Sequence, residues 1–255
     1  MNDLLRKLTV SLLAAATTAC SVTAPTQAVF QTPDRTTRQI VRERISAVVV
    51  TERDDLGSWM NERFAISNAP DDADGGSAAP ISEDGYFLTA DHVLAEADGK
   101  NVFIIHANGG KISTSRARIV WRSEADDLAI LHIPAKTPYH YQWSSPGRRI
   151  ASGLPIIHGG MATGLKSRSG TLRSSLPGDK LLGRSRIFKM DIPLEPGDSG
   201  GPVIDAYGNL IGINSAVEFL VPMETAIFID SEGVRPNIRK IQELIQRDRK
   251  SFSIR

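Results

Sequence analysis

Hydrophobic residues occur along this chain in many short runs, separated by Gly, Pro, Asn or Asp. The runs are rich in β-branched and aromatic residues, and this pattern is typical of antiparallel sandwiches and barrels. The expected strands cover residues 47–51, 85–89, 102–105, 117–121, 128–133, 155–157, 170–172, 187–190, 202–204, 210–213 and 225–229. The pattern therefore predicts an all-β fold.

Helical spacing is rare in the sequence. A short helix is expected over residues 38–46, and residues 71–77, a run of Asp, Ala and Gly, predict a loop. Four aliphatic residues recur at helical spacing behind Pro236 and predict one amphipathic closing helix: Ile238, Ile241, Leu244 and Ile245.

The N-terminal segment has the pattern of a secretory signal. Arg6 and Lys7 precede a short apolar run and then small residues up to Cys20, the one cysteine of the chain. We expect residues 1–19 to be a lipoprotein-type signal, with Cys20 as the lipid anchor to a membrane. The alternative is a conventional signal cut near Ala28. Either one predicts an exported protein of the periplasm or cell envelope.

The rest of the chain divides into a tether and one domain. Residues 20–37 are rich in Thr, Pro, Ala and Gln, which indicates a tether, and residues 38–255 form the expected domain. The 30 basic and 29 acidic side chains lack the basic excess of a nucleic-acid binder. A single cysteine excludes an intramolecular disulfide and any multi-cysteine metal site.

The candidate chemistry centres on Ser199, in the sequence Gly-Asp-Ser-Gly-Gly-Pro over residues 197–202. A serine hydroxyl is a weak nucleophile, so it needs an adjacent base and donors for the oxyanion it creates. The glycines suit a bare, tight turn in which the amides of Gly197 and Ser199 are those donors. The same residues are also compatible with an ordinary Gly-rich hairpin that has no catalytic role.

The serine motif also satisfies the G-x-S-x-G elbow of α/β-hydrolases. That arrangement places the histidine after the serine, whereas every histidine of this chain precedes Ser199, so the order excludes it. His92, at the end of an apolar strand, is the best placed as a base. The other four histidines are interpreted as packed or solvated residues, and a zinc site is not expected: His106, His132, His140 and His158.

A histidine base needs a carboxylate to hold its tautomer. Asp126 and Asp127 both precede the apolar strand at 128–131, and neighbouring residues of a strand point to opposite faces. Periodicity alone does not choose between them.

Three stretches in chain order resemble the signatures of trypsin-like serine proteases: residues 85–93, 127–131 and 197–202. Three more resemble the bacterial HtrA-type branch, at residues 81–86, 169–172 and 210–215. The resemblance runs from about residue 45 to 245. It implies two antiparallel six-stranded β-barrels with the active site between them, followed by a C-terminal α-helix.

The resemblance also implies roles for single residues. Ser199 is the implied nucleophile, His92 its base and Asp127 the orienting acid, with the amides of Gly197 and Ser199 as the oxyanion hole. The implied substrate is a protein or peptide, and no cofactor or metal is expected. The pocket wall is expected to include Ile213, Asn214 and Ser215.

Some positions depart from the family pattern. Pro193 stands where trypsins carry the aspartate that selects Lys and Arg, and the chain has no room for a PDZ domain. In digestive members of the family a freed N-terminus pairs with the acid before the serine, which is Asp198 here. In this chain Asp198 is expected to have a different partner. Pro80 removes a ladder donor, so we expect a locally altered first barrel.

Three functions remain open at this point. The chain is an active serine endopeptidase, a catalytically silent binding module on a protease scaffold, or an autoinhibited enzyme that needs a partner. The natural substrate and the oligomeric state do not follow from the sequence.

Overall fold

The computed structural model describes residues 30–56, 72–108, 111–144, 149–177, 184–220 and 227–253. The predicted signal, Cys20 and most of the tether lie outside these residues. The helices are α1 (Arg35–Arg44) and α2 (Ile238–Ser253). The strands are β1 (Ser46–Thr51), β2 (Asp74–Ser77), β3 (Ala79–Pro80), β4 (Tyr86–Thr89), β5 (Asn101–Asn108), β6 (Lys111–Ser123), β7 (Leu128–His132), β8 (Pro155–Gly160), β9 (Gly164–Thr171), β10 (Arg186–Met190), β11 (Pro202–Asp205), β12 (Leu210–Leu220) and β13 (Ile227–Arg235).

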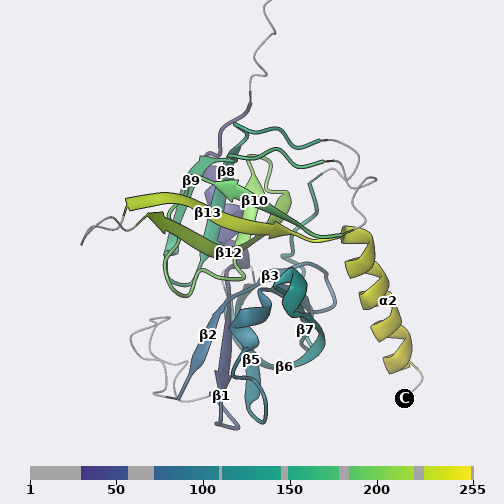
Figure 1. Cartoon of the computed structure of the whole chain (residues 1–255). Coiled ribbons are helices and arrows are strands. Elements are labelled where there is room, and N and C mark those ends of the chain that lie inside the picture. Colours follow the sequence, from purple (N-terminus) through teal and green to yellow (C-terminus); the bar gives the residue numbers. More distant parts are fainter. Residues whose placement is uncertain are drawn as a thin grey trace, which may run out of the picture.

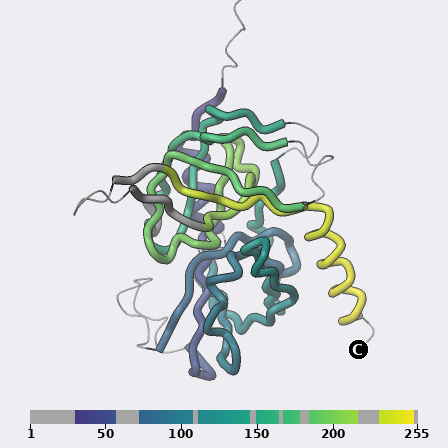
Figure 2. Tube along the Cα trace, in the orientation of Figure 1, coloured from purple at the N-terminus to yellow at the C-terminus, as the bar shows by residue number. Residues whose placement is uncertain are grey.

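The strands form two separate antiparallel sheets, seen as two lobes in Figures 1 and 2. The first sheet has the order β2-β1-β5-β6-β7-β4-β3. Its edge strands β2 and β3 follow one another in the chain with only Ala78 between them, so the sheet curls round until its two edges meet. Counted as one broken strand, they make the first lobe the expected six-stranded barrel.

The break in the first barrel occurs where the sequence predicts a local change. Pro80 has no amide hydrogen and pairs with Phe87 at the end of β3, while its carbonyl accepts a hydrogen bond from Tyr141. The proline is therefore accommodated at a barrel edge, and the fold is kept.

The second sheet has the order β10-β13-β12-β11-β8-β9. Its edge strands approach each other through a bridge between Leu172 and Met190 and through hydrogen bonds between Thr171 and Asp191, in which the Thr171 hydroxyl donates to Oδ2 of Asp191 and the Asp191 amide donates to the Thr171 carbonyl. The C-terminal helix α2 leaves this lobe and runs down beside the first, which Figure 1 shows clearly. The fold is all-β with one closing helix, as predicted, and no helix in the described residues is long and apolar enough to cross a membrane.

The prediction of a loop over residues 71–77 is wrong for residues 74–77. These residues form β2, and Gly75 and Gly76 pair with Val49 and Val48 of β1. The prediction rested on composition, whereas strand formation here depends on backbone pairing with β1, which needs no apolar side chain on β2.

Candidate active site

The three predicted site residues lie at the ends of elements from both barrels. His92 lies in a short 3₁₀ turn (Asp91–Leu94) directly after β4. Asp127 stands between a second such turn (Glu124–Asp126) and β7, and Ser199 lies in the loop between β10 and β11. Because β4 and β7 are paired neighbours, His92 and Asp127 emerge from the same barrel side by side.

His92 and Asp127 are in direct contact. The Nδ1 atom of His92 lies 2.9 Å from Oδ1 and 3.1 Å from Oδ2 of Asp127, and the His92 amide donates to Oδ1 at 3.1 Å. Asp127 is the one non-glycine residue of the described chain with positive φ, 47°. This left-handed conformation, which Asp tolerates better than most residues, turns the carboxylate back toward the imidazole.

The contact shifts the pKa values of both groups. The hydrogen bond to Asp127 raises the pKa of His92 above its ordinary value, against the effect of partial burial. Burial acts to raise the pKa of Asp127, but hydrogen bonds from His92 and Ser215 outweigh it and the net shift is downward. The pair therefore favours an anionic carboxylate beside an imidazole whose Nδ1 carries a proton.

Asp126, the alternative acid, has other partners. Its carboxylate accepts a hydrogen bond from Ser123 and lies 3.6 Å from the ammonium of Lys240 in α2. The structure therefore brings Asp127, and not Asp126, to His92.

Ser199 is connected to His92 and Asp127 indirectly, by hydrogen bonds through Ser215. The Ser215 hydroxyl donates to Oδ2 of Asp127, and the Ser199 hydroxyl donates to the carbonyl of Ser215 at 3.3 Å. No hydrogen bond joins Ser199 to His92 in the described part of the chain. Catalytic hydrogen bonds are often long or misaligned without substrate, and rotation about one side-chain bond redirects a serine hydroxyl.

The loop between β10 and β11, residues 191–201, carries Ser199 and is called the serine loop below. Gly200 allows this loop to pack closely against the end of β4. Its φ is +82°, and a Cβ there would lie 2.2 Å from the carbonyl of Ser77 and 2.3 Å from Oγ1 of Thr89. No larger residue fits without moving backbone. The loop that carries Ser199 thus touches the strand that leads to His92.

The serine loop turns its carbonyls inward. The carbonyl of Gly197 accepts from the Ser77 hydroxyl, that of Asp198 from the side chain of Asn214, and that of Ser199 from the Ser77 amide. Within the described chain, the amides of Gly197 and Ser199 donate no hydrogen bond, and Gly197 has a φ of +99°. Two free amides beside a serine hydroxyl are a suitable pair of donors for an oxyanion.

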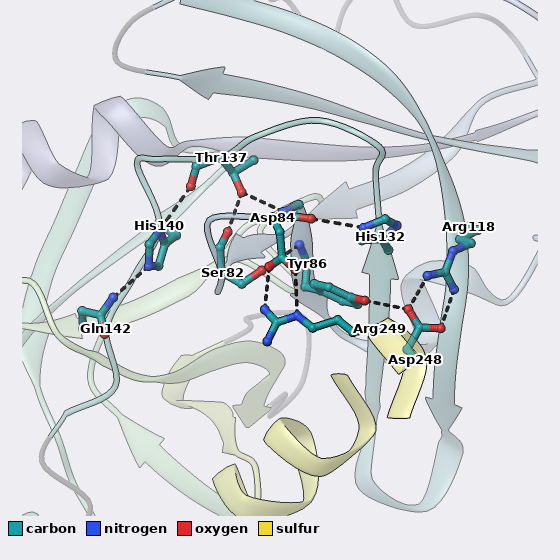
Figure 3. A network of polar contacts seen from close by, with 11 residues as sticks. Ser82, Asp84, Tyr86, Arg118, His132, Thr137, His140, Gln142, Asp248 and Arg249 are labelled. Atoms are coloured by element: carbon teal, nitrogen blue, oxygen red, sulfur yellow. Dashed lines mark hydrogen bonds and ion pairs between the residues drawn. The ribbon is translucent and has the colours of Figure 1, made fainter. Parts of the chain in front are cut away.

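None of the other four histidines forms a hydrogen bond to His92, Asp127 or Ser199 within the described residues. His132 contacts the carbonyl of Asp84, and His140 contacts that of Thr137, within the polar network of Figure 3. His106 is buried beside Ser113, and His158 is fully buried beside Asn214. Burial lowers the pKa of His158 to about 4, so its imidazole is neutral near pH 7.

The predicted pocket wall is only partly in reach of a ligand. The side chains of Ile213 and Asn214 are fully buried, and Ser215 is half-buried. A cleft of about 560 Å³ opens beside Asp127 and Ser215, with Arg184 and Arg186 also in its lining. Of the three residues, Ser215 alone borders this cleft.

Two contributors to the site were not recognised from the sequence. Arg122 of β6 forms an ion pair with buried Asp91 at 2.8 Å and so anchors the turn that carries His92. Ser215 was expected as a wall residue, and its hydrogen bond to Asp127 was not. Both contacts join residues distant in the chain, and no local pattern signals them.

Comparison with known proteins agrees with this geometry. Residues 76–213 match the family described as "Trypsin-like peptidase domain". The chain belongs to this family. It is 29% identical over 174 residues to a probable periplasmic serine endoprotease DegP-like of Pseudomonas fluorescens, covering 62% of this chain and 34% of that protein. It is 32% identical over 171 residues to a protein of the same description from Marinomonas sp., covering 60% of this chain and 34% of that protein.

Two solved structures have the same fold as this chain. The HtrA-type protease AlgW with a tripeptide superposes with a TM-score of 0.59 at 23% identity, over 85% of this chain and 65% of that one. The same protease with a decapeptide gives a TM-score of 0.57 at 24% identity, over 81% and 65%. This trypsin-like domain therefore has a chymotrypsin-like fold, as these two structures do, and it spans about a third of the length of the curated relatives it matches.

Proposed function

We propose that this trypsin-like domain is a serine endopeptidase that hydrolyses peptide bonds through an acyl-enzyme. The observation that carries the proposal is the continuous set of contacts from His92 through Asp127 and Ser215 to Ser199. Acyl transfer requires a nucleophile, a base that can come within hydrogen-bond reach of it, and an acid that orients the base.

The proposed roles follow from the contacts. Ser199 attacks the peptide carbonyl carbon while Nε2 of His92 accepts its proton, and Asp127 stabilises the resulting imidazolium through Nδ1. The carbonyl oxygen becomes an oxyanion that accepts hydrogen bonds from the amides of Gly197 and Ser199. The imidazolium then gives its proton to the leaving amine, and water hydrolyses the acyl-enzyme by the same steps in reverse order.

The proposed substrate is a protein or peptide. The peptides named with the AlgW structures, and the endoprotease names of the curated relatives, support this class. Ser215 and the cleft beside it are the proposed substrate contact, and the buried side chains of Ile213 and Asn214 support them from behind.

We also propose that the protein is exported and anchored to a membrane through Cys20. The periplasmic relatives support export, and the signal-like N-terminus supports the anchor. Replacing Cys20 by Ala is expected to move the protein from the membrane fraction to the soluble fraction of the cell envelope. Retention in the membrane would contradict a lipid anchor at this residue.

The activity is tested by labelling with a fluorophosphonate probe, which reacts with an activated serine. The wild-type protein is expected to be labelled and Ser199→Ala to be unlabelled, with unchanged melting temperature. Ser215→Ala, which keeps Ser199, serves as a second variant and is expected to be labelled more slowly. A folded wild-type protein that stays unlabelled would favour the silent binding module.

A further inference from the structure

The Asp198 side chain, next to the nucleophile in the chain, is fully buried. Its Oδ1 atom accepts hydrogen bonds from the amide of Thr163 at 3.0 Å and from Oγ1 of Thr163 at 3.2 Å, and the same hydroxyl also lies 3.3 Å from the carbonyl of Gly160. Its Oδ2 atom accepts from the amide of Glu195 at 3.0 Å. A buried carboxylate is costly unless such donors satisfy it, so these contacts determine where the side chain lies.

No cation compensates Asp198 within the described residues. The buried imidazole of His158 is nearby but neutral near pH 7, because burial lowers its pKa to about 4. The carboxylate therefore depends on Thr163 and Glu195 for its stabilisation. Thr163 supplies two of the three hydrogen bonds and comes from the turn that joins β8 to β9.

Ser77, at the end of β2, makes a second connection to the same turn. Its buried hydroxyl donates to the carbonyl of Gly197 at 2.6 Å and accepts from the amide of Met161 at 2.8 Å. Its amide also donates to the carbonyl of Ser199 at 2.8 Å. The serine loop is thus tied to residues 161–163 at two points, through Ser77 and through Asp198.

These two connections act on the backbone that supplies the oxyanion donors. Fixing the carbonyl of Gly197 and the side chain of Asp198 restricts the torsions between Gly197 and Ser199. Their amides, which donate no hydrogen bond within the described chain, are then held in a fixed orientation before any substrate arrives. Donors that need no reorganisation during the reaction stabilise a transition state most effectively.

We propose that Thr163 and Ser77 are positioning residues that hold the oxyanion hole in its working shape. The hydrogen bonds of Thr163 to Asp198 and of Ser77 to Gly197 and Met161 are together called the latch. These contacts lie within the folded chain, so the oxyanion hole is preformed without an activating ligand. This inference rests on the proposed serine endopeptidase activity. The latch acts through Asp198 and Gly197, and neither Thr163 nor Ser77 touches the substrate.

Thr163→Val is the decisive variant, because it removes the hydroxyl donor and keeps the β-branched shape. We expect kcat to fall about tenfold with KM within about twofold of wild type, since one hydrogen bond to a charged group is lost. Binding of a peptide boronic acid, which mimics the tetrahedral intermediate, is expected to weaken by the same factor. Thr163→Ser keeps the hydroxyl and is expected to restore wild-type values.

Thr171→Val is the matched control. Thr171 lies at the opposite end of β9, and its hydroxyl donates to Oδ2 of Asp191 at 2.7 Å, at the β10 end of the loop that carries Ser199 and not beside the nucleophile. Each valine variant therefore loses a hydrogen bond from a threonine hydroxyl to an aspartate carboxylate. Thr163 lies in the turn before β9, and Thr171 lies at the end of β9. Thr171→Val is expected to lower the melting temperature and to leave kcat unchanged.

Ser77→Ala and amide hydrogen exchange give an independent measurement. Exchange in the peptide covering residues 195–203 is expected to speed up in Ser77→Ala and Thr163→Val, and to stay at the wild-type rate in Thr171→Val. If Ser77→Ala does not fold, the threonine variants alone decide. Wild-type kcat and boronate affinity in Thr163→Val would overturn the latch, whereas an unlabelled wild-type protein would overturn the proposed activity itself.

Discussion

His92 and Asp127 determine how the site responds to pH. In the proposed mechanism the base must be neutral to accept the Ser199 proton, and the hydrogen bond that His92 donates to Asp127 raises the pKa of His92 above the usual value of about 6.5. The acid limb of kcat/KM is therefore expected above that pH, and activity falls as the pH drops through the raised pKa. In a protein whose basic imidazole has no carboxylate partner, the acid limb of kcat/KM lies at a lower pH.

Asp127→Asn tests this pairing. The amide lacks the charge that holds the imidazole tautomer, so kcat is expected to fall by about 10³–10⁴-fold and the acid limb to move to lower pH. Asp126→Asn is the matched control, since Asp126 pairs with Lys240 and does not contact His92. We expect the control to keep both kcat and the acid limb. A full pH profile of kcat/KM measures both effects, and loss of activity in the control alone would reverse the assignment.

The sequence alone could not choose between the two acids, for a physical reason. Residues Leu128 to Leu131 are buried on both faces of β7, so alternation carries no information about which side faces the site. The left-handed φ of Asp127 then takes its side chain out of the strand alternation altogether. Resemblance to the family motif selected Asp127, the residue that the structure brings to His92, where periodicity did not choose.

Two of the ion pairs that attach the closing helix α2 to the first barrel differ in exposure (Figure 3). Asp248 accepts a hydrogen bond from the Tyr86 hydroxyl at 2.7 Å and pairs with Arg118, and its side chain is 12% exposed. Arg249 pairs with Asp84, and both of these side chains are about half exposed, 47% and 48%. Screening by water weakens the second pair more than the first.

Asp248→Asn is therefore expected to destabilise the protein more than Asp84→Asn. Losing the charge on the more buried pair should cost about 1–3 kcal/mol of unfolding free energy, and the exposed pair about 0–1 kcal/mol. Thermal unfolding followed by circular dichroism measures the two differences. Equal losses in both variants would show that exposure does not distinguish these pairs.

The two helices differ in how far the sequence predicted them. The spacing of Ile238, Ile241 and Ile245 predicted α2, and all three side chains are buried as that pattern requires. The helix expected from residue 38 begins at Arg35, because Asp34 caps it and forms a capping box with Thr37. Residues 35–37, assigned to the tether, are therefore helical, and the cap inside a Thr-rich segment was not recognised.

One of the hydrophobic clusters among the described residues spans both barrels and is called the shared core below, while the second barrel and the first each have a smaller separate cluster. A single cluster of buried residues joins the first barrel to side chains of the second and to both helices, including Leu88, Ile204, Val41 and Ile245. The site sits where the barrels meet, because Ser199 comes from the second and His92 from the first. Neither the shared core nor this junction follows from the spacing of residues within one strand.

The shared core predicts that the barrels unfold together. Leu88 and Ile204 lie in opposite barrels and are fully buried, so truncating either to Ala should cost about 2–5 kcal/mol. In a urea series, pulsed hydrogen exchange is expected to give one midpoint for peptides from β4 and from β11, in the wild type and in each variant. Ile187→Ala is the control, since Ile187 is 65% exposed and its loss should move neither midpoint by much. If Leu88→Ala lowered the midpoint of β4 and left that of β11 unchanged, the barrels would be independent folding units. Activity would then be lost when the first barrel unfolds, while the loop that carries Ser199 still kept its structure.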